Sequence, residues 1–582
     1  MTNIKDSLII KLANHVTVAK GKKACKHLDQ VTQHPMQTQK DFLMTLLRDN
    51  QDTEYGRKYG FKDIHSVEDY RKAVPLTEYD DYAPYIERMA NKGEQNVITA
   101  YPVNHFSKSS GTMGNPKMIP FSERAAKVSD DYLKGCSYAV ADRYKMLGSS
   151  KGLNLVESHL ETLPSGATHG SYTARLILNY KTLFEKIQTP PVDVMMPREP
   201  MNTRYLLSLY ALMEPDLTYC ICAFYSYFVE VLRFIEKNWE QLADDIEQGT
   251  ISPLVEMPDD IRQKLSDRLT PNPKRAAKIR DIMSRHEPGT MFVPLLWKKF
   301  NCVMGIGTAG FSTYTEMLKQ YCGPDVSFLL QGVVASEGVF SAIYDKDTPR
   351  SVLLPDSVFY EFKPEDAEGY DHLLTIDQIE EGKNYELIVT NLSGFYRYKM
   401  KDVVKVVGKY HQTPTVEFLY RANQTVNLMG EKTTEVALRE VARRLAQRCG
   451  FSMVDYCMYP NPEAIPVRYE FLIEPNGLPD DFDWQKARDI LDECLSEANP
   501  SMGDKLARGI AGKSKLYFLE EETTLLYRDM MILKGVSSAQ LKPVRVIDNV
   551  VKHNFFYALI DDRFDMPEDL RPFAPHYITH QQ

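Results

Sequence analysis

Hydroxyl, glycine and lysine residues are concentrated in one short stretch, SKSSGTMGNPKMIP, at residues 107–120. Glycine permits backbone angles at which successive N–H groups point to one place, and such a nest binds anions. The serine and threonine hydroxyls add neutral donors, and Lys117 adds a mobile positive charge. The composition therefore favours a loop that binds a polyphosphate. Its spacing, with Met118 after Lys117, is not that of a Walker A loop, and an ordinary surface turn remains an alternative.

Two acidic residues follow apolar runs that we predict to be strands. Glu337 comes after Ser336 in the segment VVASEGVF, and Asp402 lies in GFYRYKMKDVVKV. Side chains at the point where a chain leaves a sheet are available to a ligand, so both acids are candidates for a binding role. Each can instead be a solvated turn residue, and Arg397, upstream of Asp402, can be the structural partner of a nearby acid.

The histidines and cysteines do not form a pattern typical of a metal site. The chain has 13 histidines and 9 cysteines, without a CxxC spacing, so zinc chemistry is disfavoured. Cys220 and Cys222 have the spacing of one face of a strand. Scattered cysteines in odd number favour free thiols in a reducing compartment, and we expect a cytoplasmic protein.

The bulk composition excludes several classes of partner. A chain of 582 residues is too long for one compact core, so two or more domains are expected. The formal net charge of −9 and the lack of a basic segment argue against nucleic acid and anionic membranes. The most apolar window contains Glu230 and Arg233, and predicts a buried strand running into a helix instead of a membrane span. The first residues predict an amphipathic helix and not a signal peptide.

Helical patterns dominate the first part of the chain. Helices are predicted around Gln39–Arg48 and Ala83–Ala90, and another is expected to begin at Ser122. Apolar residues recur at helical spacing across 228–246, and Gly249 is the expected end of that long helix.

Short β-rich runs replace this pattern across residues 297–407, which predicts an α/β body with several sheets flanked by helices. A second unit follows, with helices predicted at Glu435–Gln447 and Trp484–Ala498 and strands at VDYCMYP and VRYEFLIEP. In VRYEFLIEP apolar and polar residues alternate, which predicts one buried face. We therefore expect a large N-terminal domain, 1–421, and a smaller C-terminal α/β domain, 422–582.

The order of these segments resembles the adenylate-forming superfamily of acyl-CoA ligases, peptide-synthetase adenylation domains and luciferases. Finer motifs resemble one branch, the acyl-acid amido synthetases first known as auxin-responsive proteins. The matching segments cover nearly the whole chain and are TEYGRKYGF, VPLTEYDDYAPYIERM, SSGTMGNPKMIPFSE, VFYEFKP, YELIVTNLSGFYRYKMKDVV, GEKTTEVAL and GVSSAQLKPVR. The resemblance implies that the N-terminal domain holds the acyl and nucleotide sites and that the C-terminal domain is a mobile lid.

What the resemblance implies for function is a two-step ligase that uses ATP and Mg²⁺. A small carboxylic acid would attack the α-phosphorus of ATP, giving an acyl-adenylate and pyrophosphate. The amine of an amino acid would then attack the activated carbonyl, which releases AMP and leaves an amide. Catalysis would be mostly positioning and charge stabilisation. The family further implies a monomer.

The resemblance also assigns roles to single residues. Those that would contact the phosphates are Ser109, Ser110, Gly111, Thr112, Gly114, Lys117 and Ser336. Glu337 would hold Mg²⁺, and Asp402 would accept hydrogen bonds from the ribose hydroxyls. Arg421, at the hinge, would approach the nucleotide. Lys432 and Lys542 would reach the phosphates from the C-terminal domain when it rotates.

Three residues depart from the family pattern. Val333 stands where a tyrosine would stack on adenine, Ala335 replaces a serine, and Lys401 replaces the glycine before Asp402. None of the three removes a charged group with an assigned role, but they bear on how tightly ATP binds. Two rival functions therefore stay open: a ligase that passes the acyl group to coenzyme A, and a catalytically silent protein that binds a nucleotide or an acid.

Overall fold

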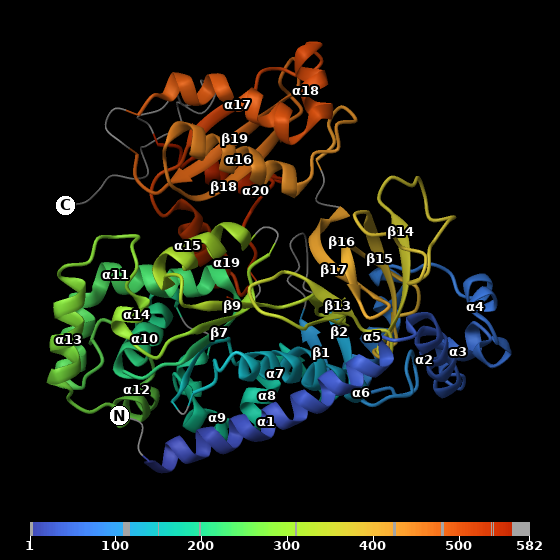
Figure 1. The fold of residues 1–582 in the computed structure, drawn as a ribbon, viewed down its shortest axis with the longest axis horizontal. Coiled ribbons are helices and arrows are strands. Elements are labelled where there is room, and N and C mark those ends of the chain that lie inside the picture. Colours follow the sequence, from blue (N-terminus) through green and yellow to red (C-terminus); the bar gives the residue numbers. More distant parts are fainter. Residues whose placement is uncertain are drawn as a thin grey trace. The chain divides into compact units, whose positions relative to one another are not determined.

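The computed structural model describes residues 4–108, 117–148, 150–196, 199–308, 311–422, 426–478, 482–536, 538 and 541–561. The chain forms two compact units, Met1–Leu419 and Tyr420–Gln582 (Figure 1). Within the described part of the chain, no helix is long and apolar enough to cross a membrane.

The first unit contains helices on all sides of its sheets. Its helices are α1 (Ile4–Val31), α2 (Pro35–Asp49), α3 (Glu54–Lys58), α4 (Val67–Ala73), α5 (Tyr79–Lys92), α6 (Glu123–Val128), α7 (Cys136–Arg143), α8 (Tyr172–Asn179), α9 (Lys181–Ile187), α10 (Pro200–Met213), α11 (Tyr225–Gln248), α12 (Asp259–Ser266), α13 (Pro273–Met283), α14 (Val293–Leu296) and α15 (Ser312–Cys322), with the short 3₁₀ turns η1 (Phe61–Asp63) and η3 (Val192–Met195) and the π-helix η2 (Ser129–Gly135).

The strands that the structure describes in this unit form three main sheets and a small hairpin. A five-stranded parallel sheet has the order β6 (Gln188–Thr189), β3 (Gly152–Leu155), β7 (Tyr219–Phe224), β8 (Cys302–Ile306), β9 (Ser327–Leu330). A six-stranded sheet has the order β12 (Ser341–Ile343), β13 (Ser351–Leu353), β17 (Thr413–Arg421), β16 (Tyr398–Tyr410), β15 (Asn384–Asn391), β14 (Val358–Pro364). A four-stranded sheet has the order β2 (Met118–Ser122), β1 (Val103–Lys108), β5 (Thr168–Gly170), β4 (Leu160–Thr162), and the hairpin pairs β10 (Val334–Ala335) with β11 (Gly338–Val339).

The five-stranded sheet is built as its sequence predicts. The apolar window forms β7 and runs directly into α11, and Cys220 and Cys222 are both buried in β7. α11 ends at Gly249, whose φ of 69° is left-handed, so the predicted helix stop is confirmed. Figure 1 shows α10, α11 and α13 gathered beside β7 and β9, where their apolar faces share one hydrophobic core with these strands.

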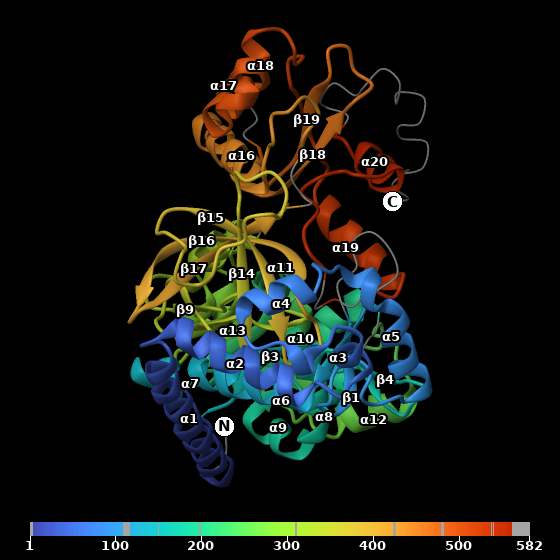
Figure 2. The ribbon, with the colours of Figure 1, turned by 90° about the vertical axis from the view of Figure 1, so that its right-hand side faces the viewer.

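A second core joins the N-terminal helices to the six-stranded and four-stranded sheets. Figure 2 shows α2, α4 and α6 in front of these sheets. Three tyrosines stack in its centre: the ring centroids of Tyr55 and Tyr396 are 5.0 Å apart, and those of Tyr55 and Tyr82 are 5.6 Å apart. Such stacking adds to the area that the rings bury. The N-terminal helices and the strand region 384–410 therefore fold as one body.

The second unit is a small α/β structure. Its described elements are α16 (Glu435–Cys449), β18 (Met453–Asn461), β19 (Arg468–Pro475), α17 (Trp484–Ala498), α18 (Pro500–Ala507), β20 (Lys515–Phe518), α19 (Thr523–Leu533) and α20 (Val550–Tyr557), with the strand order β18-β19-β20. The predicted helices at Glu435–Gln447 and Trp484–Ala498 are confirmed as α16 and α17.

The predicted buried face of β19 is confirmed at Tyr469, Phe471 and Ile473, but the opposite face is buried as well. Residues 469–474 are all buried, because α20 and the start of α19 cover the side that bears the polar residues. The buried Glu470 accepts a hydrogen bond from the Tyr557 hydroxyl at 2.5 Å, and Glu474 accepts one from the Thr524 backbone N–H at 2.8 Å. Alternation read along one strand cannot reveal a second cover supplied by later segments.

The end of α11 gives a first testable prediction. A Cβ on Gly249 would lie 2.6 Å from the Pro271 backbone nitrogen, whereas one on Gly93, the left-handed glycine after α5, would meet nothing closer than 3.6 Å. We expect Gly249→Ala to lower the unfolding free energy by about 2–4 kcal/mol, because strain and a backbone clash add. Gly93→Ala, with strain alone, should cost about 1 kcal/mol. Urea unfolding of both variants measures the difference, and equal losses would contradict the clash.

Candidate functional site

The residues Ser336 and Glu337 form the turn of the β10–β11 hairpin. Ala335 pairs with Gly338 across an antiparallel bridge, which leaves these two residues as the connection. Gly338 has a φ of 153°, a backbone conformation that favours glycine. The side chain of Glu337 is buried, with 8% of its surface exposed. A carboxylate at the end of a tight turn is thereby held out of bulk solvent.

This turn is tied to two other strands. The Ser336 hydroxyl donates a hydrogen bond to the backbone carbonyl of Lys108 at 3.1 Å, and the Asn391 side-chain amide donates one to the carbonyl of Glu337 at 3.0 Å. Lys108 is the last residue of β1. The predicted phosphate-contacting residues Ser109, Ser110, Gly111, Thr112 and Gly114 follow it directly and lie outside the described residues. The Glu337 turn therefore lies against the strand end from which that predicted loop departs.

Tyr79, at the start of α5, contacts Lys117 and feels the charge of Glu337. Its hydroxyl accepts the Met118 N–H at 3.1 Å and donates to the Met118 carbonyl at 3.2 Å. The Lys117 ammonium lies 4.8 Å from the centre of the Tyr79 ring. Burial raises the pKa of Tyr79, and the negative charges of Asp80 and Glu337 raise it further. One phenol thus lies close to both a predicted phosphate-binding lysine and the predicted metal-binding acid.

Asp402 lies at a bulge in β16. Glu386 pairs with Val403 and Ile388 pairs with Lys399, so three residues of β16 face one residue of β15 between these pairs. A bulge re-aims the side chains around it and is common beside binding sites. Asp402 is buried, with 5% of its surface exposed.

The bulge explains how Lys401 can replace a glycine. Lys401 has a φ of 63°, which is the left-handed conformation that glycine adopts without strain. Its ammonium pairs with the Glu78 carboxylate at 3.1 Å, and Lys399 pairs with the same oxygen at 2.6 Å. Both lysines lower the pKa of Glu78, with Lys399 contributing first. The turn therefore keeps its left-handed form with a side chain present.

The segment Thr77–Tyr79 connects these parts. The Thr77 hydroxyl donates to the Tyr396 carbonyl at 2.8 Å, and the Lys399 N–H donates to the Thr77 carbonyl at 2.9 Å. Three consecutive residues thus contact the start of β2, the start of β16 and the lysines of the bulge. The sequence alone indicated no site role for this segment, which lies within VPLTEYDDY. The only feature of the sequence that marks this segment is TEYD at a predicted helix start, and a helix-capping motif explains that feature equally well.

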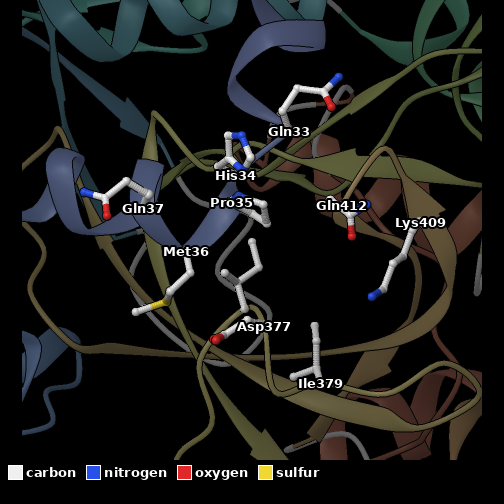
Figure 3. A pocket seen from close by; sticks show the side chains of 10 residues that line it. Gln33, His34, Pro35, Met36, Gln37, Asp377, Ile379, Lys409 and Gln412 are labelled. Atoms are coloured by element: carbon white, nitrogen blue, oxygen red, sulfur yellow. The ribbon is translucent and has the colours of Figure 1, made fainter.

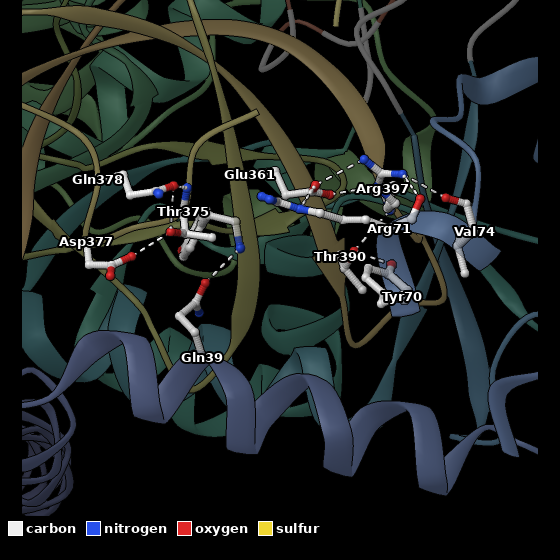
Figure 4. A network of polar contacts seen from close by, with 11 residues as sticks. Gln39, Tyr70, Arg71, Val74, Glu361, Thr375, Asp377, Gln378, Thr390 and Arg397 are labelled. Carbon is white, nitrogen blue, oxygen red and sulfur yellow. Dashed lines mark hydrogen bonds and ion pairs between the residues drawn. The ribbon is translucent and has the colours of Figure 1, made fainter. Parts of the chain in front are cut away.

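Arg397 has the structural role that the sequence left open. Its guanidinium donates to Glu361 at 2.9 and 3.1 Å and to the carbonyls of Arg71 and Val74 at 2.8 Å each (Figure 4). Arg71 donates at 2.9 Å to Glu361 Oε1, one of the two oxygens that accept from Arg397. This buried network joins α4, β14 and the start of β16.

Val333, which stands where the family pattern has a tyrosine, is a core residue. It is 4% exposed and belongs to the core between the helices and the six-stranded sheet. Its N–H donates to the Ser341 hydroxyl at 2.7 Å. The side chain at this position therefore contributes to packing.

In the second unit, Lys432 is exposed on a braced loop. The backbone N–H groups of Leu428 and Met429 donate to the Glu431 carboxylate at 2.7 and 2.6 Å, and the Tyr469 hydroxyl donates to it at 2.6 Å. Lys432 has a φ of 48°, so the loop turns at this residue and its side chain is exposed.

Lys542 precedes a firmly anchored arginine. Arg545 donates to the Asp455 carboxylate and to the Tyr456 carbonyl, the latter at 2.8 Å, and its guanidinium lies 4.4 Å from the Tyr456 ring centre. The chain after Lys542 is thereby fixed to β18. Arg421, the last residue of β17, is half-buried and belongs to the second unit.

A separate pocket of about 360 Å³ lies between the α1–α2 junction and the six-stranded sheet (Figure 3). Its lining includes His34, Met36, Asp377, Ile379 and Lys409. No predicted site residue is part of that lining. In the described ranges, no group of three or more histidine, cysteine or acidic side chains could hold a metal ion.

Family models match this chain in three consecutive parts. Residues 24–326 match the N-terminal domain of the GH3 family, residues 351–421 its central domain and residues 433–551 its C-terminal domain.

Individual relatives cover nearly the same range. A jasmonoyl–L-amino acid synthetase of Nicotiana attenuata, JAR4, is 26% identical, covering 84% of this chain and 86% of its own. An indole-3-acetic acid-amido synthetase of Arabidopsis thaliana, GH3.3, is 25% identical, covering 99% of each chain. Among solved structures, the GH3.15 acyl acid amido synthetase is 22% identical, with a TM-score of 0.78 over 92% of this chain and 96% of that one. This structural likeness shows a shared fold.

The Arg397 network gives a prediction of stability. Replacing Arg397 by leucine leaves the buried Glu361 carboxylate with Arg71 alone, so we expect a loss of about 3–5 kcal/mol in unfolding free energy. Arg280→Leu is the matched control, because its partners Asp244 and Glu247 are exposed, and it should cost no more than about 1 kcal/mol. Urea titration of both proteins measures these values. Similar losses in the two variants would show that burial of Glu361 does not matter.

Proposed function

Since the chain belongs to the GH3 family, we propose that it is an ATP-dependent ligase that joins a small carboxylic acid to the amine of an amino acid. The acid first displaces pyrophosphate from ATP to form an acyl-adenylate. The amine then displaces AMP and leaves an amide. This order answers a chemical need, because hydroxide leaves a carboxyl group poorly and AMP leaves readily.

The observation that carries the proposal is the bond between the Ser336 hydroxyl and the Lys108 carbonyl. It fixes the Glu337 turn against the strand end that leads into residues 109–116. An acid beside the strand end after which a glycine- and hydroxyl-rich sequence follows suits a nucleotide with its counter-ion, since backbone N–H groups and hydroxyls accommodate the phosphate charge.

Different residues of the N-terminal domain contact the phosphates and the ribose of ATP in this proposal. We assign the phosphates to Ser109, Ser110, Gly111, Thr112 and Gly114, with Lys117 and Ser336 beside them. Asp402 accepts the ribose hydroxyls, where its charge strengthens each hydrogen bond. Tyr79 holds the start of β2 and so orients Lys117.

Glu337 fits a magnesium ion in part. It is a buried carboxylate whose charge is felt at Tyr79, and Mg²⁺ in nucleotide sites commonly takes one or two carboxylates together with phosphate oxygens and water. When bound, the ion would neutralise phosphate charge during adenylation. The protein's part is to keep the Glu337 carboxylate in place through the two hydrogen bonds of its turn.

The second unit supplies the remaining groups in this proposal. Arg421 contacts the nucleotide near the hinge, and Lys432 and Lys542 reach the phosphates when the proposed lid domain, 422–582, moves over the N-terminal domain. The hydrogen bonds in the Lys432 loop and at Arg545 support the assignment of the two lysines, because they hold both lysine-bearing segments in place. We further propose a monomer that acts in the cytoplasm, without a nucleic acid or membrane partner.

The central test replaces Glu337. Glu337→Ala keeps the backbone carbonyl that binds Asn391, so the turn should survive while the carboxylate is lost. We expect at least about 100-fold less ATP-dependent hydroxamate when hydroxylamine traps the adenylate across a panel of carboxylic acids. Glu368→Ala, an exposed acid in the same unit, is the control and should match wild type. Wild-type trapping by the Glu337 variant would refute the assignment.

A second test concerns the ribose contact. Asp402→Asn keeps the shape of the side chain but removes its charge, so we expect about a tenfold higher KM for ATP with a smaller change in kcat. Steady-state pyrophosphate release at varied ATP measures both constants. A changed kcat at an unchanged KM would place Asp402 elsewhere in the reaction.

The acyl acceptor is decided by product analysis. With amino acids and coenzyme A supplied together, mass spectrometry should find the amide as the product. A thioester as the main product would favour an acyl-CoA ligase. Absence of hydroxamate with every acid would favour a protein that only binds its ligands.

A further inference from the structure

α1 crosses the helical segment η2–α7 at two glycines. A Cβ on Gly21 would lie 2.0 Å from the carbonyl oxygen of Gly135, so only glycine fits at this position on α1. Figure 1 shows α1 passing α7 along its length, and the two helices pack together there. Backbones in contact bring the side chains of the next helical turn unusually close.

Two thiols lie beside this crossing: Cys25 is one helical turn after Gly21, and Cys136 directly follows Gly135. The sulfur atoms of Cys25, on α1, and Cys136, the first residue of α7, are 3.5 Å apart and share a hydrogen bond. Cys136 is fully buried and Cys25 is half-buried. A small oxidant can therefore reach Cys25 from solvent, whereas Cys136 is shielded from it.

The surroundings make Cys25 the more acidic thiol. The hydrogen bond with Cys136 lowers the pKa of Cys25, and the positive charge of Arg143 lowers it further, against burial and the charge of Asp29. The same hydrogen bond raises the pKa of Cys136, as do burial and the charge of Asp131. Other cysteines differ, since burial raises the pKa of Cys449. The lowered pKa of Cys25 favours the nucleophilic thiolate at the accessible member of the pair.

From this geometry we propose that Cys25 and Cys136 are an oxidation site that forms an intrachain disulfide with hydrogen peroxide. The Cys25 thiolate attacks one peroxide oxygen, the O–O bond breaks, and a sulfenic acid forms while the released hydroxide takes up a proton to give water. The Cys136 sulfur then attacks the sulfenic sulfur, its S–O bond breaks, and the hydroxyl leaves as water with the Cys136 proton. Two electrons pass from the sulfurs to peroxide.

The disulfide acts on the hairpin that carries Glu337. Bonding draws the sulfurs from 3.5 Å to about 2.05 Å, and the glycine crossing leaves the backbones no room to approach. The shift must therefore move η2 and the start of α7. η2 packs on β11, and Cys136 shares a small hydrophobic cluster with Val339 and Ala342. This step rests on the proposed function: we expect oxidation to lower kcat/KM for ATP several-fold, because small displacements of positioned groups are costly.

The test uses the full-length reduced protein treated with a small excess of hydrogen peroxide and then with N-ethylmaleimide. Peptide mass spectrometry should find a Cys25–Cys136 cross-linked peptide that lacks two hydrogens, and dithiothreitol should restore both labelled thiols and the ATP-dependent activity. Cys25→Ser should prevent the cross-link and keep its activity in peroxide. Cys449→Ser, the matched control, should behave as wild type.

The possible results test the oxidation site, its effect on the hairpin and the proposed function separately. Labelling of both thiols after peroxide, or a cross-link between other cysteines, would overturn the oxidation site. A complete Cys25–Cys136 disulfide with unchanged activity would overturn its effect on the hairpin. Reduced protein inactive with every acid would count against the proposed function, while the mass spectra would still decide the thiol pair.

Discussion

The site depends on one hydrogen bond between segments that are 228 residues apart in the chain, from the Ser336 hydroxyl to the Lys108 carbonyl. This bond joins the hairpin that carries Glu337 to the end of β1, a strand of another sheet. The two-residue turn that makes this bond is itself held from the other side by Asn391. The arrangement therefore depends on backbone groups as much as on the acid that it presents.

The start of α5 gives this contact a rigid neighbour. Thr77, Glu78 and Tyr79 connect to β16, to the lysines of its bulge and to Met118 of β2, so two strands share one helix terminus. The Arg397–Glu361 pair fixes the same stretch of β16 to α4 and β14. Buried charge is used here to hold segments in register.

The residues that depart from the family pattern have different structural consequences. Lys401 keeps the left-handed turn that a glycine would make, and Glu78 pairs with the added ammonium. Val333 is built into the core, so an aromatic contact with adenine has no counterpart at that position. The first change is compensated locally, whereas the second alters what the nucleotide can contact. Neither touches the hydrogen bonds that hold the Glu337 turn.

The sequence by itself determined the elements whose signals are local. Helical spacing and Gly249 predicted α11, Trp484–Ala498 predicted α17, and the motif order indicated the family. It also marked Glu337 and Asp402 as candidate acids, from residue type and position alone. Only the tertiary structure decided what lies beside them: the cover over the polar side of β19, the contacts of Tyr79, the pairing of Arg397, and the approach of Cys25 to Cys136. Each of these is a contact between segments far apart in the chain, and periodicity along one segment holds no information about which distant surface will cover it.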